Sequence, residues 1–410
     1  MTNSKYVPKR RFKEFELDDE WNLLKLDEVA KYRNGKAHEH SISLQGKFIV
    51  VNSKFISTNG EVKKFTDLQI EPIFKNEISF VLSDVPNGRA IARTFLIEQN
   101  DKYTLNQRIA AITPNSNISP YYLYVLLNRN KYFLEFDDGV KQTNLSKADV
   151  LEFKEYYPIS KEQSMIGDFF QTIDALISNH QHKLDKLKNL KKAYLSEMFP
   201  AEGERVPKRR FPGFEGEWEQ KKLGQLMDVG SVKRVHQSDW RDRGVRFLRA
   251  RDIVSESKNK KPDDFLYIDE ELYKKYSAIS GMVEKGDLLV TGVGTIGVPM
   301  LVESSDPLYF KDGNIIWFKN KNLLDGHFFY YSFTARAIQK FIGDVAGVGT
   351  VGTYTIDSGK NTPILLPVTK EEQVVIGNFF KKLDHSITLQ QQKLDKLNDL
   401  KKAYLNELFV

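Results

Sequence analysis

Apolar residues recur at helical spacing in two long segments of the chain. In residues 162–199 they fall three or four positions apart, with lysine, aspartate and asparagine between them, and the same pattern returns in residues 372–409. This spacing places the apolar side chains along one narrow stripe of a helix. Pro158 and Pro367 stand just upstream, where a helix start tolerates proline, and Pro200 follows the first segment. The pattern predicts two amphipathic helices, each roughly 57 Å long.

The two predicted helices are copies of one sequence. Aligned without a gap, residues 162–199 and 372–409 are identical at 22 of 38 positions. The hexapeptide VPKRRF also occurs twice, at residues 7–12 and 206–211, and a Glu-Trp pair follows each copy. Linker, globular segment and helix therefore occur twice in the same order, which indicates an internal duplication.

Two matching apolar stripes can bury each other, so we expect the helices to pair as a coiled coil. The alternative is that each helix packs only on its own domain. His180 and Gln390 fall at equivalent positions of the stripe, where a polar residue either helps to fix the register or is partly exposed. The expected interface residues are Ile173, Ile177, Leu184, Leu187 and Leu190 in the first helix and Leu383, Ile387, Leu394, Leu397 and Leu400 in the second.

The globular segments between these anchors have diverged. They share short β-rich runs, such as residues 108–112 and 314–318, each followed by an aromatic helical stretch, which predicts a mixed α/β (α+β) domain in each copy. Linkers and helices that stay similar while the globular domains between them diverge are typical of two domains that recognise different targets. The predicted segments are a first domain with its linker (1–157), a first spacer helix (158–200), a linker with a second domain (201–366) and a second spacer helix (367–410).

The composition argues against disulfides, metal sites and membrane-spanning segments. The chain has no cysteine, and its seven histidines show no metal-binding spacing, so we expect neither a disulfide nor a metal site. No apolar run approaches the roughly 18 residues of a membrane span, and the N-terminus has no apolar signal core. These features favour a soluble, cytoplasmic protein. The net charge of +6 is compatible with a polyanionic partner but does not require one.

The catalytic motifs for which we searched are missing or incomplete. Gly292, Gly294 and Gly297 form a literal GxGxxG after a predicted strand, but Pro299 and another β-like run follow where a dinucleotide site needs a helix. We interpret this loop as one whose backbone approaches a ligand or DNA closely. The sequence contains no P-loop and no motif for amino methylation. Two bare ExK triplets are ordinary surface sequence in a chain that is 28% charged.

A basic run is the strongest candidate for DNA contact. Residues 231–251 carry seven lysines and arginines, opposed only by Asp239 and Asp242 within the run, with Trp240 and Phe247 between them. An arginine fork can hold a phosphate or the edge of guanine, and asparagine or glutamine can pair with adenine. The alternative is a solvated charged face. A glycine-rich polar loop at residues 347–360 matches residues 139–144 in position. The candidate DNA-binding residues are Arg89, Arg93, Arg108, Lys141, Gln142 and Asn144 in the first domain and Lys233, Arg234, Arg249, Arg251, Thr291, Thr295, Asn314 and Lys360 in the second.

The whole frame resembles the specificity subunit of type I restriction-modification enzymes. The resemblance is carried by the VPKRRF linkers with their Glu-Trp pairs, by the helix starts PISKEQ and PVTKEEQ, and by the KLDKL…LKKAYL helices. It covers essentially the whole chain. One departure is arginine at positions 10 and 209, where we expect an apolar linker residue; this concerns packing.

The resemblance implies a non-catalytic, sequence-specific DNA-binding subunit. Two pseudo-symmetric target-recognition domains would each read one half of a split double-stranded DNA site, and the two long helices would form an antiparallel coiled coil that separates them. The subunit would recruit two modification subunits, which methylate adenine with S-adenosylmethionine, and two restriction subunits, which are motor-nucleases that use ATP and Mg²⁺. No cofactor is expected on this chain itself.

Two other classes of protein stay open on sequence alone. A stand-alone DNA-modifying enzyme would need a catalytic constellation, and we find none. A coiled-coil scaffold without nucleic acid would not need two diverged heads in so well kept a frame. Binding to duplex DNA in a gel-shift experiment separates the scaffold from the reader.

Overall fold

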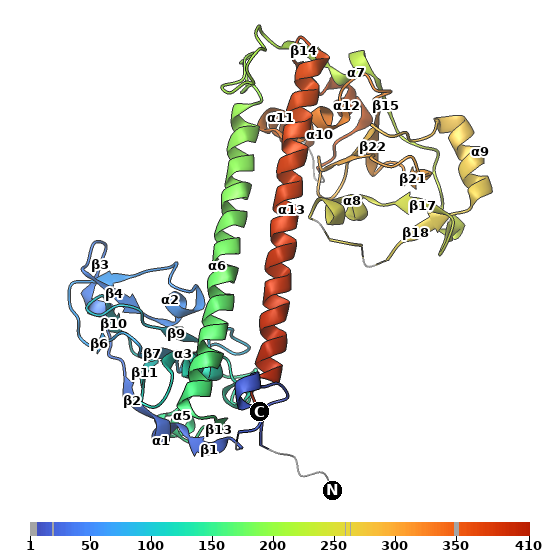
Figure 1. Ribbon diagram of the computed structural model, residues 1–410. Helices are drawn as coiled ribbons and strands as arrows, with labels where there is room; N and C mark the ends of the chain where they lie inside the picture. Colours follow the sequence, from blue (N-terminus) through green and yellow to red (C-terminus); the bar gives the residue numbers. More distant parts are fainter. Residues whose placement is uncertain (1–5, 19, 259, 263, 348–351) are drawn as a thin grey trace. The chain divides into compact units, whose positions relative to one another are not determined.

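A computed structural model describes residues 6–18, 20–258, 260–262, 264–347 and 352–410 (Figure 1). The chain forms two compact units: unit 1 combines residues 1–181 with 392–410, and unit 2 is residues 182–391. Helix α6 (Ser160–Glu197) begins in unit 1 and ends in unit 2, and helix α13 (Lys370–Glu407) runs from unit 2 back into unit 1. Each unit therefore holds one globular domain, the first part of one long helix and the last part of the other.

The domain of unit 1 is built around a four-stranded antiparallel sheet ordered β2, β11, β7, β9. In β11, Ala110 and Ile112 belong to one apolar core, and Ile109 and Ala111 belong to another. Alternate side chains of a strand point to opposite faces, so β11 is apolar along its buried length because both faces of the sheet are covered. The second core lies against a five-stranded sheet ordered β3, β5, β4, β10, β6, in which β4 and β10 are parallel.

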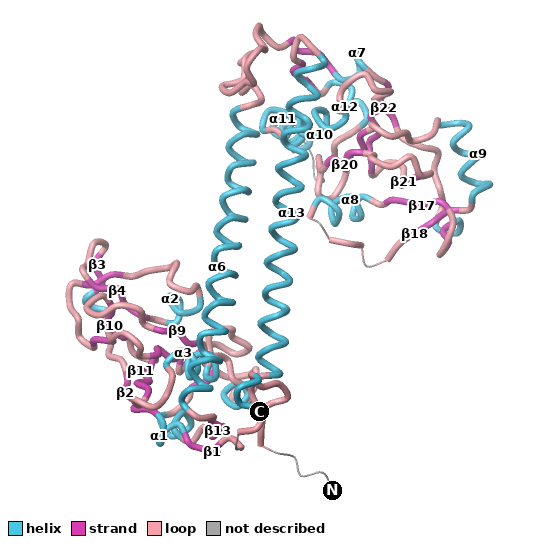
Figure 2. The backbone as a smooth tube through the Cα atoms, viewed as in Figure 1, coloured by secondary structure: helices cyan, strands magenta, loops and turns pink. Residues whose placement is uncertain are grey.

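The elements of this domain are β1 (Asn22–Lys25), β2 (Ala30–Asn34), β3 (Ile42–Ser43), β4 (Phe48–Val51), β5 (Phe65–Thr66), β6 (Pro72–Ile73), β7 (Ile78–Val81), β8 (Ser83–Asp84), β9 (Thr94–Leu96), β10 (Tyr103–Leu105), β11 (Ile109–Pro114), β12 (Thr143–Asn144), β13 (Lys154–Tyr157), α1 (Leu26–Val29), α2 (Ser53–Ser57), α3 (Pro120–Leu127), α4 (Lys131–Leu134), α5 (Lys147–Leu151) and the 3-10 turns η1 (Lys13–Phe15) and η2 (Glu39–Ser41). Figure 2 shows how short most of them are.

The domain of unit 2 repeats this topology with a different sequence. Its central sheet has the order β15, β22, β19, β20, and a second sheet, ordered β16, β18, β17, β21, again contains one parallel pair. The predicted mixed α/β fold is thus confirmed in both copies. The elements are β14 (Glu219–Lys222), β15 (Asp228–Gly230), β16 (Trp240–Arg241), β17 (Val245–Leu248), β18 (Leu266–Ile268), β19 (Leu288–Thr291), β20 (Pro299–Leu301), β21 (Leu308–Phe310), β22 (Ile315–Lys319), β23 (Pro363–Leu366), α7 (Leu223–Leu226), η3 (Gln237–Asp239), α8 (Ala250–Ser257), α9 (Glu270–Ser280), α10 (Gly326–Thr334), α11 (Arg336–Ala346) and α12 (Ile356–Asn361).

Each long helix docks its first turns on the domain that precedes it. In unit 1 the side chain of Gln163 accepts a hydrogen bond from the backbone N–H of Ser119, at the start of α3 (3.1 Å). In unit 2 Gln373 accepts the equivalent bond from Asp325, at the start of α10 (3.1 Å). A Cβ added to Gly377 would lie 2.8 Å from the backbone nitrogen of Phe328, so glycine is required for this close approach.

The two long helices are antiparallel within each unit. In unit 1 Asp174 of α6 pairs with Lys401 of α13 (2.5 Å) and accepts a hydrogen bond from the hydroxyl of Tyr121 (2.9 Å). Nearer the start of α6, Phe169 contacts Tyr404, so residue numbers rise along one helix as they fall along the other. Unit 2 repeats the arrangement, with Asp384 between Lys191 (2.6 Å) and Tyr331 (2.7 Å). The predicted pairing of the helices is confirmed.

The predicted stripe needs one correction. Leu190 and Leu400 are 41% and 43% exposed, and the partly buried residues at this turn are Lys191 and Lys401. Two successive steps of three residues from Leu184 turn a helix by about −120°, whereas a step of three followed by a step of four turns it by only about −20°. The stripe therefore continues from Leu187 to a lysine whose ammonium group pairs with an aspartate. Of the other predicted residues, Ile173, Leu184, Leu383 and Leu394 are buried, and Ile177, Leu187, Ile387 and Leu397 are half-buried.

The arginines that depart from the linker motif have a structural role. The guanidinium of Arg10 pairs with Glu407 and lies over the ring of Tyr404, 5.5 Å from its centre. In unit 2 Arg209 pairs with Glu197 and lies over Tyr194 at 5.2 Å. Each arginine therefore fastens a linker to the last turns of a long helix.

Candidate nucleic-acid interface

In the first domain three loops meet at the end of strand β7. Strand β8 pairs with β12, and the side chain of Gln142 donates a hydrogen bond to the hydroxyl of Ser83 (2.7 Å). The N–H of Leu82 donates to the carbonyl of Arg108 (2.9 Å), which brings the β10–β11 turn to the same place. All six candidates of this domain lie on these three loops, which we call the first edge. They are Arg89, Arg93, Arg108, Lys141, Gln142 and Asn144.

The carboxylates of the first edge are occupied by backbone N–H groups. One oxygen of Asp84 accepts from Ala90 (2.5 Å) and Ile91 (3.1 Å). Asp138 accepts from Lys141 and Val140, and these bonds lower the pKa of its carboxyl group. These aspartates bind the backbone of the loops and form no ion pairs with the cations there. Among the described residues, no acidic side chain pairs with Arg89, Arg93, Arg108 or Lys141.

The second domain has an equivalent edge. The N–H of Gly292 donates to the carbonyl of Asn314 (2.8 Å), and the N–H of Tyr354 donates to the carbonyl of Gly292 (2.8 Å), as Leu82 bonds to Arg108 and Leu145 in the first domain. Thr295 is exposed on the loop between β19 and β20, and Asn314 is half-buried. Part of the predicted glycine-rich loop at residues 347–360 lies here, but residues 348–351 are outside the described part of the chain.

Thr291 was a wrong prediction as a DNA contact. Its side chain is fully buried, donates to the carbonyl of Thr295 (2.5 Å) and accepts from the N–H of Val298 (3.0 Å). The hydroxyl group closes the base of the loop and has no surface left for a ligand. Its neighbour Thr295 stays a candidate.

Two of the three glycines in the GxGxxG loop make room for the protein itself. A Cβ on Gly292 would lie 2.6 Å from the carbonyl oxygen of Tyr354, and one on Gly297 would lie 3.0 Å from Ile342. Of the three, Gly294 is the one with no described atom within 4 Å of an added Cβ. The loop leads into strand β20, as the sequence predicted, and no helix N-terminus is available there for a pyrophosphate.

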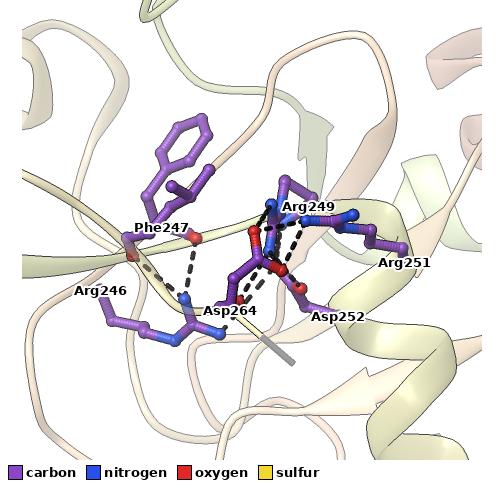
Figure 3. A network of polar contacts seen from close by, with 7 residues as sticks. Arg246, Phe247, Arg249, Arg251, Asp252 and Asp264 are labelled. Carbon is purple, nitrogen blue, oxygen red and sulfur yellow. Dashed lines mark hydrogen bonds and ion pairs between the residues drawn. The ribbon is translucent and has the colours of Figure 1, made fainter. Parts of the chain in front are cut away.

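Ion pairs with aspartates occupy two arginines in the second half of the basic run (Figure 3). Arg249 donates hydrogen bonds to both Asp252 (3.0 Å) and Asp264 (2.9 Å), and Arg251 pairs with the same Asp264 (2.6 Å). Burial lowers the pKa of Arg249, but its bonds with Asp264 and Asp252 outweigh that effect and raise the pKa overall, while Arg249 lowers the pKa of Asp264. The bonds and burial of Arg249, whose side chain is 13% exposed, contradict its predicted contact with a base, whereas Arg251, 61% exposed, stays a candidate.

Of the other cations of the run, Arg246 packs against an aromatic ring, and Arg234 and Lys233 are exposed. Arg246 lies over the ring of Phe265 (4.4 Å). Arg234 is exposed and pairs with Asp312, two residues before Asn314 (2.8 Å). Lys233 is exposed, and its backbone carbonyl accepts from the hydroxyl of Tyr309 (2.8 Å).

Two residues remain to be placed: Lys360, a predicted candidate of the second domain, and Arg129, which the sequence did not indicate. Lys360 lies exposed on α12, against Gly224 of α7. Arg129 was not predicted, yet its guanidinium donates to the carbonyls of Gly88 (3.4 Å) and Ile91 (3.3 Å) at the first edge. It follows α3 in an ordinary polar turn, so nothing in the local sequence distinguishes it.

Comparison with known proteins decides the family. The family described as "Type I restriction modification DNA specificity domain" matches residues 18–189 and 215–399, one match for each copy.

The chain belongs to this specificity family.

Two relatives cover most of the specificity chain. The type I restriction enzyme MjaVIII specificity subunit of Methanocaldococcus jannaschii is 22% identical over 98% of this chain and 96% of its own length. A putative type I restriction enzyme specificity subunit of Haemophilus influenzae is 25% identical over 77% of this chain and 78% of its own. The crystal structure of a type I restriction-modification system S subunit from M. genitalium has the same fold, with a TM-score of 0.67 at 16% identity over 98% of this chain and 99% of that one.

No three metal-binding side chains gather in the described residues. In the same part of the chain, no helix is long and apolar enough to cross a membrane.

The arginine network yields a prediction about stability. Replacing Arg249 by alanine removes the guanidinium bonds to the buried carboxylate of Asp252 and should lower the free energy of unfolding by about 1–3 kcal/mol. This carboxylate is 2% exposed, and among the described residues it keeps only the backbone N–H of residue 249 and Arg246 at 4.0 Å. Replacing the exposed Arg251 should cost below about 1 kcal/mol. Urea unfolding measures both. A change in the recognised DNA sequence in either variant, without loss of stability, would restore the original interpretation.

Proposed function

We propose that this specificity subunit reads a bipartite double-stranded DNA target, with one half-site for each domain. The observation that carries the proposal is the duplicated frame: the four-stranded central sheet, the docking of the long helices and the ion pairs between the helices recur in both units, while the loops at the two equivalent edges differ. Exposed Gln142 and Asn144 are suited to adenine edges, and Val140, 77% exposed on the same loop, is suited to a thymine methyl group.

Membership of the family supports a role as the non-catalytic part of a larger enzyme. We propose that two modification subunits methylate adenine with S-adenosylmethionine and that two restriction subunits, driven by ATP with Mg²⁺, cut DNA. This chain would bind none of these cofactors itself. Its contribution is to decide where on the duplex the partner subunits act.

The test exchanges one head. Residues 22–157 are replaced by the first domain of another family member, the chain is co-expressed with its modification subunit, and methylated adenines are mapped across a genome. We expect one half-site to change and the other to stay, because only the first edge has been replaced. Exchange of residues 219–366 is the reciprocal control and should change the other half-site. Simultaneous change of both half-sites would contradict two independent readers, and absence of duplex binding by the wild-type complex in a gel shift would contradict the proposed function itself.

A further inference from the structure

Three arginines gather on one loop of the first edge. The side chain of Arg93 donates from Nε to the carbonyl of Arg89 (2.6 Å), which places its guanidinium over the backbone of that residue. Arg129 reaches the same loop from the end of α3 through its bonds to the carbonyls of Gly88 and Ile91. Arg89 and Arg93 lie four residues apart on this loop, and the fold brings Arg129 to them from the end of α3.

The loop is held in an unusual backbone conformation. Asn87 and Ala92 both have positive φ values, 54° in each case, and Arg129 has a φ of 57°. For residues with a side chain this region costs of order 1 kcal/mol each. The carboxylate of Asp84, which accepts from Ala90 and Ile91, holds the loop in this form.

The three guanidinium groups form no direct ion pair in the part of the chain that the structure describes. The nearby carboxylates of Asp84 and Asp137 accept backbone N–H bonds. Burial lowers the pKa of Arg129, and the charges of Arg93 and Arg89 lower it further, although Asp84 and Asp137 act in the opposite direction. The cluster thus holds three positive charges without a direct ion pair in the described residues, although the carboxylates of Asp84 and Asp137 lie near it.

The arginines of the second domain provide the contrast. Arg234 has Asp312, and Arg249 and Arg251 share Asp264. Each of these three arginines of the basic run is paired with an aspartate. At the first edge the chain supplies backbone carbonyls instead, which fix the position of two guanidinium groups without removing their charge.

We infer that Arg89, Arg93 and Arg129 form a binding site for a phosphodiester group of the DNA backbone, beside the base-reading loop of β12. This rests on the proposed function. Each guanidinium has five N–H donors, and the carbonyl bonds use Nε of Arg93 and one terminal nitrogen of Arg129, so forked donors remain for the phosphate oxygens. A phosphate contact fixes the register of the domain on the duplex and carries no sequence information, which is left to Gln142 and Asn144.

The test separates phosphate binding from base reading. The double variant Arg89→Ala/Arg93→Ala is compared with wild type in the complex with its modification subunit, on a duplex that contains the mapped target and on an unrelated duplex, from 50 to 200 mM salt. We expect a loss of roughly tenfold on both duplexes at the higher salt, a salt slope reduced by about 1, as for one phosphate contact, and an unchanged methylated sequence. Gln142→Ala/Asn144→Ala should instead relax the first half-site.

A matched control removes the same charge elsewhere in the domain. Lys63→Ala/Lys64→Ala deletes two exposed cations from the loop before β5 and should leave affinity and salt slope close to wild type. Equal losses in this control, an unchanged slope in the arginine variant, or an altered methylated sequence would each overturn the inference. The single variant Arg89→Ala removes an exposed side chain that makes no hydrogen bond or ion pair with the described residues, and it keeps the test valid if the double variant is poorly folded. A wild-type complex that binds neither duplex overturns the proposed function, whereas wild-type binding with an unaffected arginine variant overturns this inference alone.

Discussion

Replacing Arg210 by alanine is expected to lower the free energy of unfolding of the chain by about 3–5 kcal/mol. Its guanidinium donates two hydrogen bonds of 2.7 Å to Glu372 in the first turn of α13. The side chain of Glu372 is only 2% exposed, so its carboxylate would stay buried with no cation beside it. Trp218, Trp240 and Trp317, three of the four tryptophans, lie in unit 2, so fluorescence during urea unfolding reports on the affected unit.

The neighbouring arginine is the matched control. Arg209 makes an ion pair with Glu197 in which the side chains are 56% and 37% exposed, so its replacement by alanine should cost below about 1 kcal/mol. Combining Arg210→Ala with Glu372→Gln should recover part of the loss, because the buried charge is then removed. Equal losses for the two arginines, or no recovery in the double variant, would show that burial of the carboxylate is not the cause.

The frame of the molecule could be predicted from its sequence because it depends on local and repeated signals. The spacing of Leu184 and Leu187 reports a helix stripe directly, and the duplication shows that a partner with the same stripe exists. The prediction failed at Leu190, where the next residue, Lys191, occupies the stripe. A lysine fits there only because Asp384 of the other helix and the ring of Tyr331 receive its ammonium group, and both lie far away in sequence.

The candidate site was harder to predict because charge is balanced through space. Counting acids within the basic run found two aspartates, but the residue that neutralises Arg249 and Arg251 is Asp264, outside the run. Conversely, the sequence does not reveal that the aspartates at the first edge accept hydrogen bonds from backbone N–H groups. Arg129 escaped detection for the same reason: its importance comes from Gly88 and Ile91, not from its neighbours in the sequence.

The helices should set the distance between the two half-sites, and lengthening both should lengthen the spacer of the DNA target. The chain passes between the units only at residues 181–182 and 391–392, both inside the long helices. Insertion must be made there, because the first turns of α6 are docked to the domain through Glu162, which is fully buried, and Gln163. Seven residues added at each crossing turn the helix by about −20°, so the stripe is kept, and add about 10 Å, or roughly three base pairs.

We therefore expect the double insertion to methylate the same two half-sites with a spacer about three base pairs longer, since neither edge has been altered and only the helical connections have grown. Adenine methylation mapped after co-expression with the modification subunit measures the spacer. Inserting seven residues only at 181–182 is the control: the antiparallel partner then lacks the matching length, pairs such as Lys191 with Asp384 and Lys401 with Asp174 cannot both form in their present register, and methylation should fall sharply. An unchanged spacer in the double insertion would mean that the distance is set by the partner subunits or by the DNA, and that the paired helices only join the two readers.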